Sequence, residues 1–346
     1  MNTSKDKYTL YGSELSYYTG KVRAYLDWKN LNYEEISGSL EVFKNTLLPN
    51  VGRGIIPVLQ TPDNKFIQDS AEIINFLERA HPETIMGPTG AAQGFTSLLI
   101  ELFADEWMII PGLHYRWNYN EDWTYQNFGK TSLPEATAEE QYRFGKSRGQ
   151  FFRNWMPEVG ISEATIPGIE KSYHAFLTQF TRHLQDQPFV FGDRPSHADF
   201  SLYGPLYAHL YRDPHSGEFM KENAPAVSAW VERCRDIRQK KTDGLLIPND
   251  NVPQTLLPIL ATQMREQLPV LLATNNALER WAATAPPETE LPRGFETIPC
   301  TIGGHAGTCL ARSFPLWRLQ AAMDHYQDLD AADKAAADSL LDSVEG

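Results

Sequence analysis

The chain has 346 residues, of which 42% are hydrophobic and 12% aromatic, enough for more than one domain with its own core. A formal net charge of −13 argues against nucleic acid or an anionic membrane as the main partner. No apolar run has the length of a membrane span, the N-terminus lacks the apolar core of a secretion signal, and the three cysteines form no CxxC pair, so we expect a reduced, cytoplasmic protein.

The first part of the chain has the pattern of a sheet covered by helices. β-prone runs alternate with a helical segment and then occur as a close pair separated by a turn. This order predicts two parallel strands, an antiparallel hairpin and a final helix, the βαβ-ββα arrangement of a thioredoxin-like domain. The predicted elements are a strand at 8–11, a helix at 21–28, a strand at 31–36, a hairpin at 54–67 and a helix at 70–80 that ends before His81-Pro82.

The following region changes to helical spacing and shows no convincing strand pair, so it predicts an all-α domain. The glycine-rich segment from Glu83 to Gly94 is the expected linker. Ser196 followed three residues later by Asp199 has the form of a capping box. The predicted helices are 95–110, 138–155, 166–184, 197–211 and 224–238.

Residues 244–346 form an extension with weaker signals. Helical spacing at 253–271 and an aromatic-rich run at 314–326 predict helices. Proline and glycine predict an irregular segment at 284–307, and Gly303 to Gly307 is interpreted as a flexible turn, because it lacks the Lys and Ser or Thr of a phosphate loop. The alanine-rich acidic stretch from Asp328 fits either a helix or a frayed end.

One segment of the first domain offers two contacts to a small peptide that ends in a carboxylate. Pro57 lies inside an apolar strand, where it has no N–H for a sheet, so we expect an edge position or a cis bond after Ile56. The backbone before such a bond is free to pair with an extended peptide. The next helix begins at Asp69-Ser70, where backbone N–H groups and the Ser70 hydroxyl can bind a carboxylate. The alternative for these two residues is a plain helix cap.

The Ile-Pro strand, the Asp-Ser helix start and an all-α domain with Ser-x-x-Asp together resemble the glutathione transferase superfamily over about residues 8–240. Within it, the long helices and the tail are similar to a bacterial group of longer members. The resemblance implies an α+β protein with a thioredoxin-like glutathione-binding domain at 1–86, an all-α C-terminal domain at 87–243 and an extension at 244–346. It implies glutathione as the cosubstrate. We expect no metal, because no His, Cys, Asp or Glu group has the spacing of a metal site.

The resemblance also implies where glutathione binds. The backbone of Ile56, beside Pro57, is expected to pair with the cysteinyl part, and Asp69 and Ser70 to hold the γ-glutamyl end. Gln68 is an alternative to Asp69. Arg53, before the strand, is a candidate for the glycyl carboxylate, although basic residues at such positions are usually solvated.

The group that holds the glutathione thiolate is expected in the turn before the first helix. By its position before Lys21-Val22-Arg23, Ser16 corresponds to the hydroxyl or thiol that the family uses there, and Tyr17 ranks second. Lowering a thiol pKa from about 8.5 to about 6.5 takes about 2.7 kcal/mol, within reach of one hydrogen bond to a charged group. Serine instead of cysteine favours addition or displacement over thiol exchange. The alternative role for Ser16 is an ordinary helix cap, and the other candidates for the thiolate contact are Tyr18, Tyr11 and Ser13.

An aromatic, partly basic strip follows in the first long helix and just past it. In the family this helix lines the pocket of the second substrate, so the strip could stack on an aromatic electrophile. Core packing between helices is the alternative. The candidate residues are Trp107, His114, Tyr115 and Arg116.

These features favour a cytoplasmic, detoxifying glutathione transferase-like enzyme, expected to be a homodimer like most of the family. Its Ser16-stabilised thiolate would attack a small hydrophobic electrophile. One alternative is another glutathione-dependent reaction: isomerisation, dehalogenation or ether cleavage. The other is a non-catalytic binding or scaffold protein with the same fold.

Overall fold

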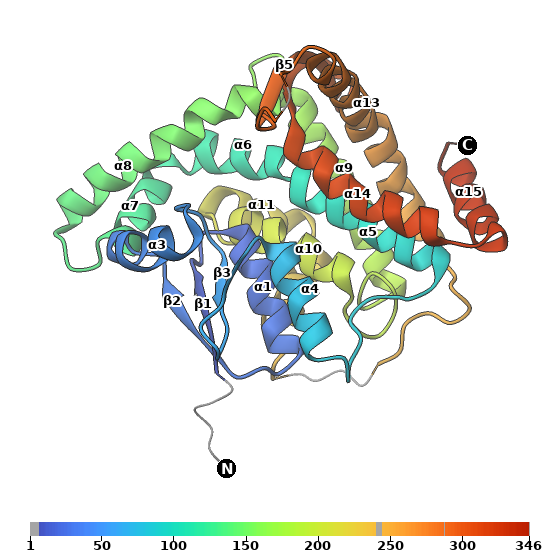
Figure 1. Ribbon diagram of the computed structural model, residues 1–346, viewed down its shortest axis with the longest axis horizontal. Coiled ribbons are helices and arrows are strands. Elements are labelled where there is room, and N and C mark those ends of the chain that lie inside the picture. The colour runs from blue at the N-terminus through green and yellow to red at the C-terminus, as the bar shows by residue number, and fades with distance from the viewer. Residues whose placement is uncertain (1–6, 240–243, 287, 346) are drawn as a thin grey trace. The chain divides into compact units, whose positions relative to one another are not determined.

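The computed structural model describes residues 7–239, 244–286 and 288–345 (Figure 1). The chain divides into two compact units. Unit 1 consists of Met1–Met86, Tyr115–Arg153 and Asp199–Asp243, and unit 2 of Gly87–His114, Asn154–Ala198 and Gly244–Gly346. One division falls between Met86 and Gly87. The domain bounds 1–86, 87–243 and 244–346 stay a prediction. The predicted helical domain is shared between the units, and the extension folds with part of it.

Unit 1 contains a four-stranded sheet in the order β2-β1-β3-β4. β1 pairs in parallel with β2 and antiparallel with β3, which pairs antiparallel with β4. With α1 after β1 and α4 after β4, this confirms the predicted thioredoxin-like βαβ-ββα domain. The bounds are β1 (Tyr8–Gly12), α1 (Tyr17–Trp28), β2 (Tyr33–Ser37), β3 (Val58–Gln60), β4 (Phe66–Gln68) and α4 (Ser70–Ala80).

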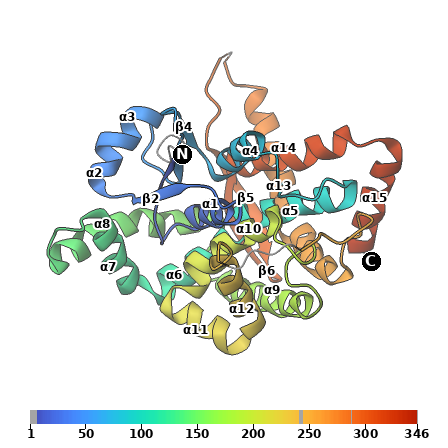
Figure 2. The ribbon, with the colours of Figure 1, turned by 90° about the horizontal axis from the view of Figure 1, so that it is seen from below.

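The two faces of this sheet are covered differently. Tyr11 and Val58 pack with Leu47 on one face, where the connection from β2 to β3 folds as short helical turns. Residues alternate between faces along a strand, so Leu10 and Leu59, both fully buried, point the other way. Figure 2 shows the whole ribbon, with this domain, from below. The helical turns are α2 (Leu40–Val42), the π-helical η1 (Phe43–Leu47) and α3 (Leu48–Val51).

The rest of unit 1 is helical. α7 and α8 approach so closely that a Cβ at Gly145 would overlap the carbonyl oxygen of Tyr125. The predicted helix at 197–211 is present, but it changes to π-helical hydrogen bonding after Pro205, the residue that cannot donate to the helix. The bounds are α6 (Ile109–Tyr119, which begins in unit 2), α7 (Glu121–Ser132), α8 (Ala138–Trp155), α10 (His197–Pro205), η3 (Leu206–Tyr211), α11 (Pro214–Asn223) and α12 (Pro225–Arg235).

Unit 2 is built around α13, which contacts α5, α9, α14, α15 and both strands of a hairpin. The extension therefore supplies the centre of this unit. The predicted helix at 314–326 and a terminal helix from 331 are both present. The bounds are α5 (Ala91–Glu106), η2 (Met156–Val159), α9 (Ile166–Asp186), η4 (Gln254–Leu256), α13 (Leu257–Ala282), β5 (Gly294–Ile302), β6 (His305–Arg312), α14 (Ser313–Asp328) and α15 (Ala331–Glu345).

The prediction of an irregular segment at 284–307 is wrong, because β5 and β6 form an antiparallel hairpin within and beyond it. Gly303 and Gly304 form the two-residue turn with φ 58° and 87°, as the tight hairpin turns require. Pro299 is tolerated in β5 because a two-stranded sheet consists of edge strands.

Other boundaries also differ from the prediction. The helix predicted at 95–110 ends at Glu106, and α6 starts after Trp107 and Met108. α7 and α11 were not predicted as helices. α1 starts at Tyr17 instead of Lys21, because Ser16 caps it.

Candidate functional site

Three segments of unit 1 converge at one end of its sheet. Tyr11 of β1 lies opposite Val58 of β3, and Val58 lies opposite Gln68 of β4. The turn after β1, the residues before β3 and the residues after β4 therefore emerge at the same end of neighbouring strands. These segments carry Ser16, Ile56-Pro57 and Asp69-Ser70, so the structure brings together the predicted thiolate and glutathione residues.

Ser16 is the N-cap of α1. Its Oγ accepts the N–H of Thr19 over 3.2 Å, so the predicted alternative role as a cap is present. A hydroxyl also carries one O–H donor. Within the described part of the chain, no acceptor for this O–H is recorded, and the side chain is half-buried. Capping and donation to a thiolate are therefore compatible in one side chain.

The tyrosines near Ser16 have other hydroxyl partners. Tyr17 is buried, and its hydroxyl donates to that of Tyr18 over 2.7 Å. The Tyr11 hydroxyl donates to Gln60 over 2.8 Å, and burial, with a smaller effect of the Glu34 charge, raises its pKa. The fourth candidate, Ser13, accepts the N–H of Leu15 through its Oγ over 3.2 Å.

The bond between Ile56 and Pro57 is cis, as expected from a proline inside an apolar strand. β3 starts at Val58, and among the described residues no hydrogen bond to the Ile56 backbone is recorded. An N–H and a carbonyl are thus available to an extended ligand at the sheet end. Arg53 is exposed and follows Gly52, which has φ 69°.

Asp69 caps α4, and its Oδ1 accepts the N–H groups of Ala71 and Glu72 over 2.9 and 3.2 Å. Its φ of 79° is rare for a residue other than glycine, and such values gather at functional sites. Ser70 is buried, and in the part of the chain that the structure describes no hydrogen bond of its hydroxyl is recorded. Gln68 is half-buried at the end of β4.

Arg116 has a partner for each of its five N–H donors, all inside unit 1. Nε and Nη2 donate to the two carboxylate oxygens of Asp213 over 2.7 and 2.8 Å. Nη1 bonds the Leu15 carbonyl over 2.8 Å and His209 Nε2 over 2.7 Å, and Nη2 bonds the Ala208 carbonyl over 2.7 Å. Contact of this guanidinium with a second substrate stays a prediction that the arrangement does not support.

The other three residues of the predicted strip are also buried. In unit 2, Trp107 Nε1 donates to Glu266 over 3.3 Å, and His114 Nε2 lies 3.1 Å from Glu170. In unit 1, the Tyr115 ring stacks on Tyr119 with the centroids 5.6 Å apart. Their role in substrate binding stays a prediction.

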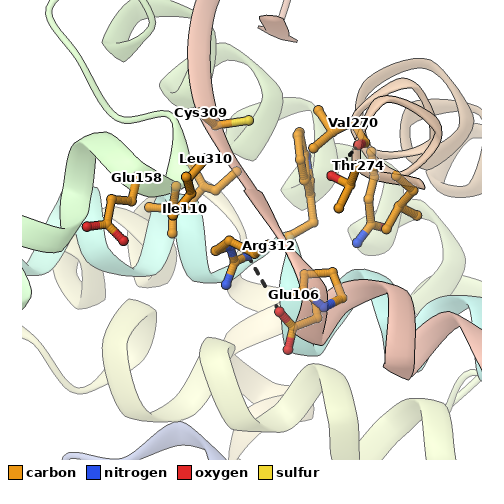
Figure 3. Close-up of a pocket in the computed structure, with 13 residues that line it drawn as sticks. Glu106, Ile110, Glu158, Val270, Thr274, Cys309, Leu310 and Arg312 are labelled. Atoms are coloured by element: carbon orange, nitrogen blue, oxygen red, sulfur yellow. Dashed lines mark hydrogen bonds and ion pairs between the residues drawn. The ribbon is translucent and has the colours of Figure 1, made fainter. Parts of the chain in front are cut away.

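Small cavities in unit 2 adjoin the strip. Trp107 lines two of them, of about 30 and 20 Å³, room for about one water molecule each. In the first, Arg312 pairs with the buried Glu106 over 3.5 Å (Figure 3). A larger cavity of about 290 Å³ lies between α9, α13 and the hairpin turn, and Lys171 and Arg265 are among the residues that line it.

Sequence reasoning missed three interactions that hold the turn carrying Ser16: His209 with Tyr17, Glu14 of the turn with Tyr207, and Asp213 with Arg116, which in turn bonds Leu15. The Glu14 carboxylate accepts the hydroxyl of Tyr207 over 2.7 Å, and burial with this bond raises the pKa of Tyr207 to about 12. Partners this far apart in the chain leave no local sequence signal.

No described helix has the length and apolar character needed to cross a membrane. Likewise, the described residues contain no group of three or more His, Cys, Asp or Glu side chains that could hold a metal ion.

Comparisons with known proteins agree with this architecture. The model of the glutathione S-transferase N-terminal domain matches residues 10–85, and that of the C-terminal domain matches residues 163–233. A curated relative, the isoprene-epoxide–glutathione S-transferase of Rhodococcus sp. (strain AD45), is 23% identical over 226 residues, which are 64% of this chain and 92% of the relative.

Two solved structures align with this chain over nearly all of their own length. The β-etherase LigF from Sphingobium sp. strain SYK-6 matches with a TM-score of 0.49 and 17% identity, over 68% of this chain and 99% of that one. A glutathione S-transferase from Rhodospirillum rubrum F11 matches with a TM-score of 0.43 and 19% identity, over 71% and 96%. Both domain models are matched in order, the first on the βαβ-ββα sheet, and together with the curated relative they support the glutathione S-transferase superfamily for this chain.

Proposed function

We propose that the protein is a glutathione transferase whose Ser16 hydroxyl stabilises the glutathione thiolate for attack on a small hydrophobic electrophile. The observation that carries this proposal is the convergence of Ser16, the Ile56 backbone and Asp69-Ser70 at one end of the sheet. In the proposed complex, Ile56 beside Pro57 pairs with the cysteinyl part. Asp69 and Ser70, with Gln68, hold the γ-glutamyl end, and Arg53 meets the glycyl carboxylate.

The energy required is within reach of this site. A hydrogen bond to a charged group contributes about 1.5–3 kcal/mol, and the N-terminus of α1 adds about 0.3–1 kcal/mol for an anion. Together these lower a thiol pKa by about 1.3–3 units. Since Ser16 Oγ already accepts from Thr19, its proton is directed away from the helix backbone. The hydroxyl can therefore donate to a thiolate without giving up the cap.

The name of the Rhodococcus relative supports an epoxide as the first electrophile to test. Opening an epoxide joins the thiolate sulfur to a ring carbon and breaks the bond between that carbon and the ring oxygen, and the resulting alkoxide takes a proton from water to become an alcohol. Trp107, His114 and Tyr115 are candidates for the second-substrate pocket, with Arg116 as the less supported fourth. The proposal includes a cytoplasmic homodimer with a role in detoxification. The alternatives are isomerisation, dehalogenation or ether cleavage with glutathione, or a non-catalytic binding or scaffold protein of this fold.

Calorimetric titration with glutathione, paired with turnover on styrene oxide and chlorodinitrobenzene, tests the proposal. We expect micromolar to low millimolar binding and enzymatic consumption of at least one electrophile. S-methylglutathione is the matched control, since it keeps both carboxylates but cannot form a thiolate, and it should bind without reacting. Binding without turnover would favour another glutathione-dependent reaction, and no binding would favour the non-catalytic alternative.

A further inference from the structure

The turn that carries Ser16 is held on both sides by the helical part of unit 1. Before Ser16, the Leu15 carbonyl accepts a hydrogen bond from Arg116 Nη1 over 2.8 Å. After it, the Tyr17 ring meets the His209 ring edge to face, with centroids 5.6 Å apart and an interplanar angle of 86°. Arg116 Nη1 and His209 Nε2 lie 2.7 Å apart. Two side chains in contact with one another thus bracket Ser16.

The position of Arg116 is set by groups outside this turn. The side chain is 2% exposed and Asp213 is 0% exposed, and Asp213 binds the guanidinium with both oxygens, the geometry that fixes its plane. The Ala208 carbonyl takes a further N–H. Because the guanidinium plane is fixed, the direction of the Nη1 N–H that donates to Leu15 is fixed as well, and this hydrogen bond sets the position of the Leu15 carbonyl.

His209 is neutral in this arrangement. Arg116 has donors and no acceptor, so Nε2 of His209 has to accept the 2.7 Å hydrogen bond, which puts the ring proton on Nδ1. His209 lies in the π-helical turn η3, a type of turn that is frequent at functional sites. The ring thereby connects the guanidinium to the Tyr17 side of the turn.

We propose that Arg116 is a positioning residue for the glutathione thiolate. By fixing the Leu15 carbonyl and, through His209, the Tyr17 ring, it holds the Ser16 hydroxyl where the thiolate sulfur lies. This inference rests on the proposed function. A group that stabilises a reacting atom has to stay within about 0.5 Å of the position in which it does so. If the turn were loose, the Ser16 hydroxyl would occupy that position only a small part of the time. An ion pair that served stability alone would need only the bonds between Arg116 and Asp213. In this protein the two N–H groups of Arg116 Nη1 bond to Leu15 and His209 as well.

The test uses variants that separate position from stability. Arg116→Met alone leaves Asp213 buried and unpaired, which is strongly destabilising. The double variant Arg116→Met with Asp213→Asn removes both charges together and leaves no buried ion. Arg116→Lys keeps the charge but lacks the planar fork. The matched control is Lys29→Met with Glu78→Gln, which removes another partly buried pair of unit 1, 2.8 Å apart.

For each folded variant the readouts are the melting temperature, the pKa of bound glutathione from the ultraviolet absorbance of its thiolate, and kcat and KM on chlorodinitrobenzene. In the double variant we expect the pKa of bound glutathione to rise by at least about one unit and kcat to fall at least about tenfold. The KM for glutathione should change less than threefold, because the contacts at Ile56 and Asp69-Ser70 remain. For Arg116→Lys, the pKa of bound glutathione and kcat should lie between those of the double variant and those of the unmodified protein. The control pair should alter the melting temperature alone.

The inference and the proposed function fail in different ways. An unchanged thiolate pKa and kcat in the double variant and in Arg116→Lys would overturn the inference while glutathione still binds. An equal loss of thiolate stabilisation in the Lys29-Glu78 control would also overturn it, since any lost ion pair would then have the same effect. Failure of the unmodified protein to bind glutathione would overturn the proposed function and the inference with it.

Discussion

Asp213 occupies the N-cap position of α11, yet both of its carboxylate oxygens bond to Arg116, at 2.7 and 2.8 Å, and none caps the helix. An N-cap aspartate ordinarily accepts a helix N–H, a bond that contributes about 0.5–2 kcal/mol. In this protein the carboxylate orients a guanidinium instead. The N–H of His215, in the first turn of α11, donates instead to Asn120 Oδ1 over 2.9 Å.

Asn120→Ala should therefore lower the free energy of unfolding by about 1–3 kcal/mol, because it removes the acceptor of this partly buried N–H. Besides the N–H of His215, the carbonyl of Tyr115 loses its bond to Asn120 Nδ2, at 3.0 Å. Urea denaturation measures the change. Asn223→Ala, at the exposed end of the same helix, is the control and should stay within about 0.5 kcal/mol. Equal effects of the two substitutions would refute this role of Asn120.

Ser16→Ala tests the thiolate contact separately from the helix cap. We expect the pKa of bound glutathione to rise and turnover to fall by about tenfold or more, with a stability loss of about 0.5–2 kcal/mol from the missing cap. Ser39→Ala is a closely matched control, because Ser39 caps α2 with a bond of the same length, 3.2 Å to the N–H of Val42. It should change stability by a similar amount or less and leave turnover unchanged. Unchanged turnover in Ser16→Ala would move the role to Tyr17.

The extension should prove necessary for the folding of unit 2. Arg318 of α14 pairs with Glu101 and Asp105 of α5, at 2.9 and 3.5 Å, and all three side chains are buried. Arg318→Met leaves two buried carboxylates without this cation and should cost about 3–5 kcal/mol. The exposed pair of Arg280 and Glu296 is the comparison, and Arg280→Met should cost less than about 1 kcal/mol. Thermal and urea unfolding of both variants decide, and a loss below 1 kcal/mol for Arg318→Met contradicts the prediction.

Local sequence signals were enough for much of unit 1. The helix from Ser70 to Ala80 could be predicted because Asp69 caps its start and Pro82 follows its end. Ile56-Pro57 and the Asp-Ser helix start carry their signals within a few residues. The hairpin of unit 2 was missed because glycine and proline indicate irregular structure unless the alternation of Ile298, Cys300 and Ile302, all buried, is given more weight.

Tertiary partners are harder to predict than local elements. The sequence neighbours of Arg116 suggest a member of the aromatic strip, and its partner Asp213 lies 97 positions away in the chain. Asp213 itself has the sequence signature of a helix cap before Pro214. Neither signal points to the turn at Ser16, because the link depends on the packing of α6 against the segment after α10.

Mild acid should weaken unit 2 through His183. This ring is buried, with Nε2 3.2 Å from the Phe189 carbonyl and Nδ1 2.8 Å from the Thr255 hydroxyl. Burial lowers its pKa from 6.5, although the bond to Phe189 opposes this. Because the unfolded chain then binds the proton more readily, stability is complete above about pH 6.5 and is lost as the pH falls below it, by up to about 1.4 kcal/mol per pH unit.

Urea denaturation at pH 7 and pH 5 measures this effect. His183→Gln can donate to Phe189 and accept from Thr255 without titrating, so its unfolding free energy should depend less on pH than that of the unmodified protein. The pKa of His174 is also lowered by burial, and its contribution is common to both proteins. The same pH dependence in both would contradict the role of His183.

The hairpin turn of unit 2 offers a test of steric contact against backbone strain. Gly303 and Gly304 both have positive φ, 58° and 87°, a conformation that costs other residues about 1–2 kcal/mol. A Cβ at Gly303 would also overlap the Gly168 carbonyl oxygen, whereas a Cβ at Gly304 would have no atom within 4 Å. Gly303→Ala should therefore lower the free energy of unfolding by at least about 1 kcal/mol more than Gly304→Ala.

Urea denaturation of both variants gives the difference, and Gly304→Asn should restore part of the loss, since asparagine tolerates this region. Gly87→Ala, with no atom within 4 Å of its Cβ and no positive φ, is the control and should stay within about 0.5 kcal/mol. Equal losses for the two turn variants would mean that β5 and β6 can move away from α9 without cost. In that case the close approach of Gly303 to Gly168 would not contribute to the packing of the hairpin on α9.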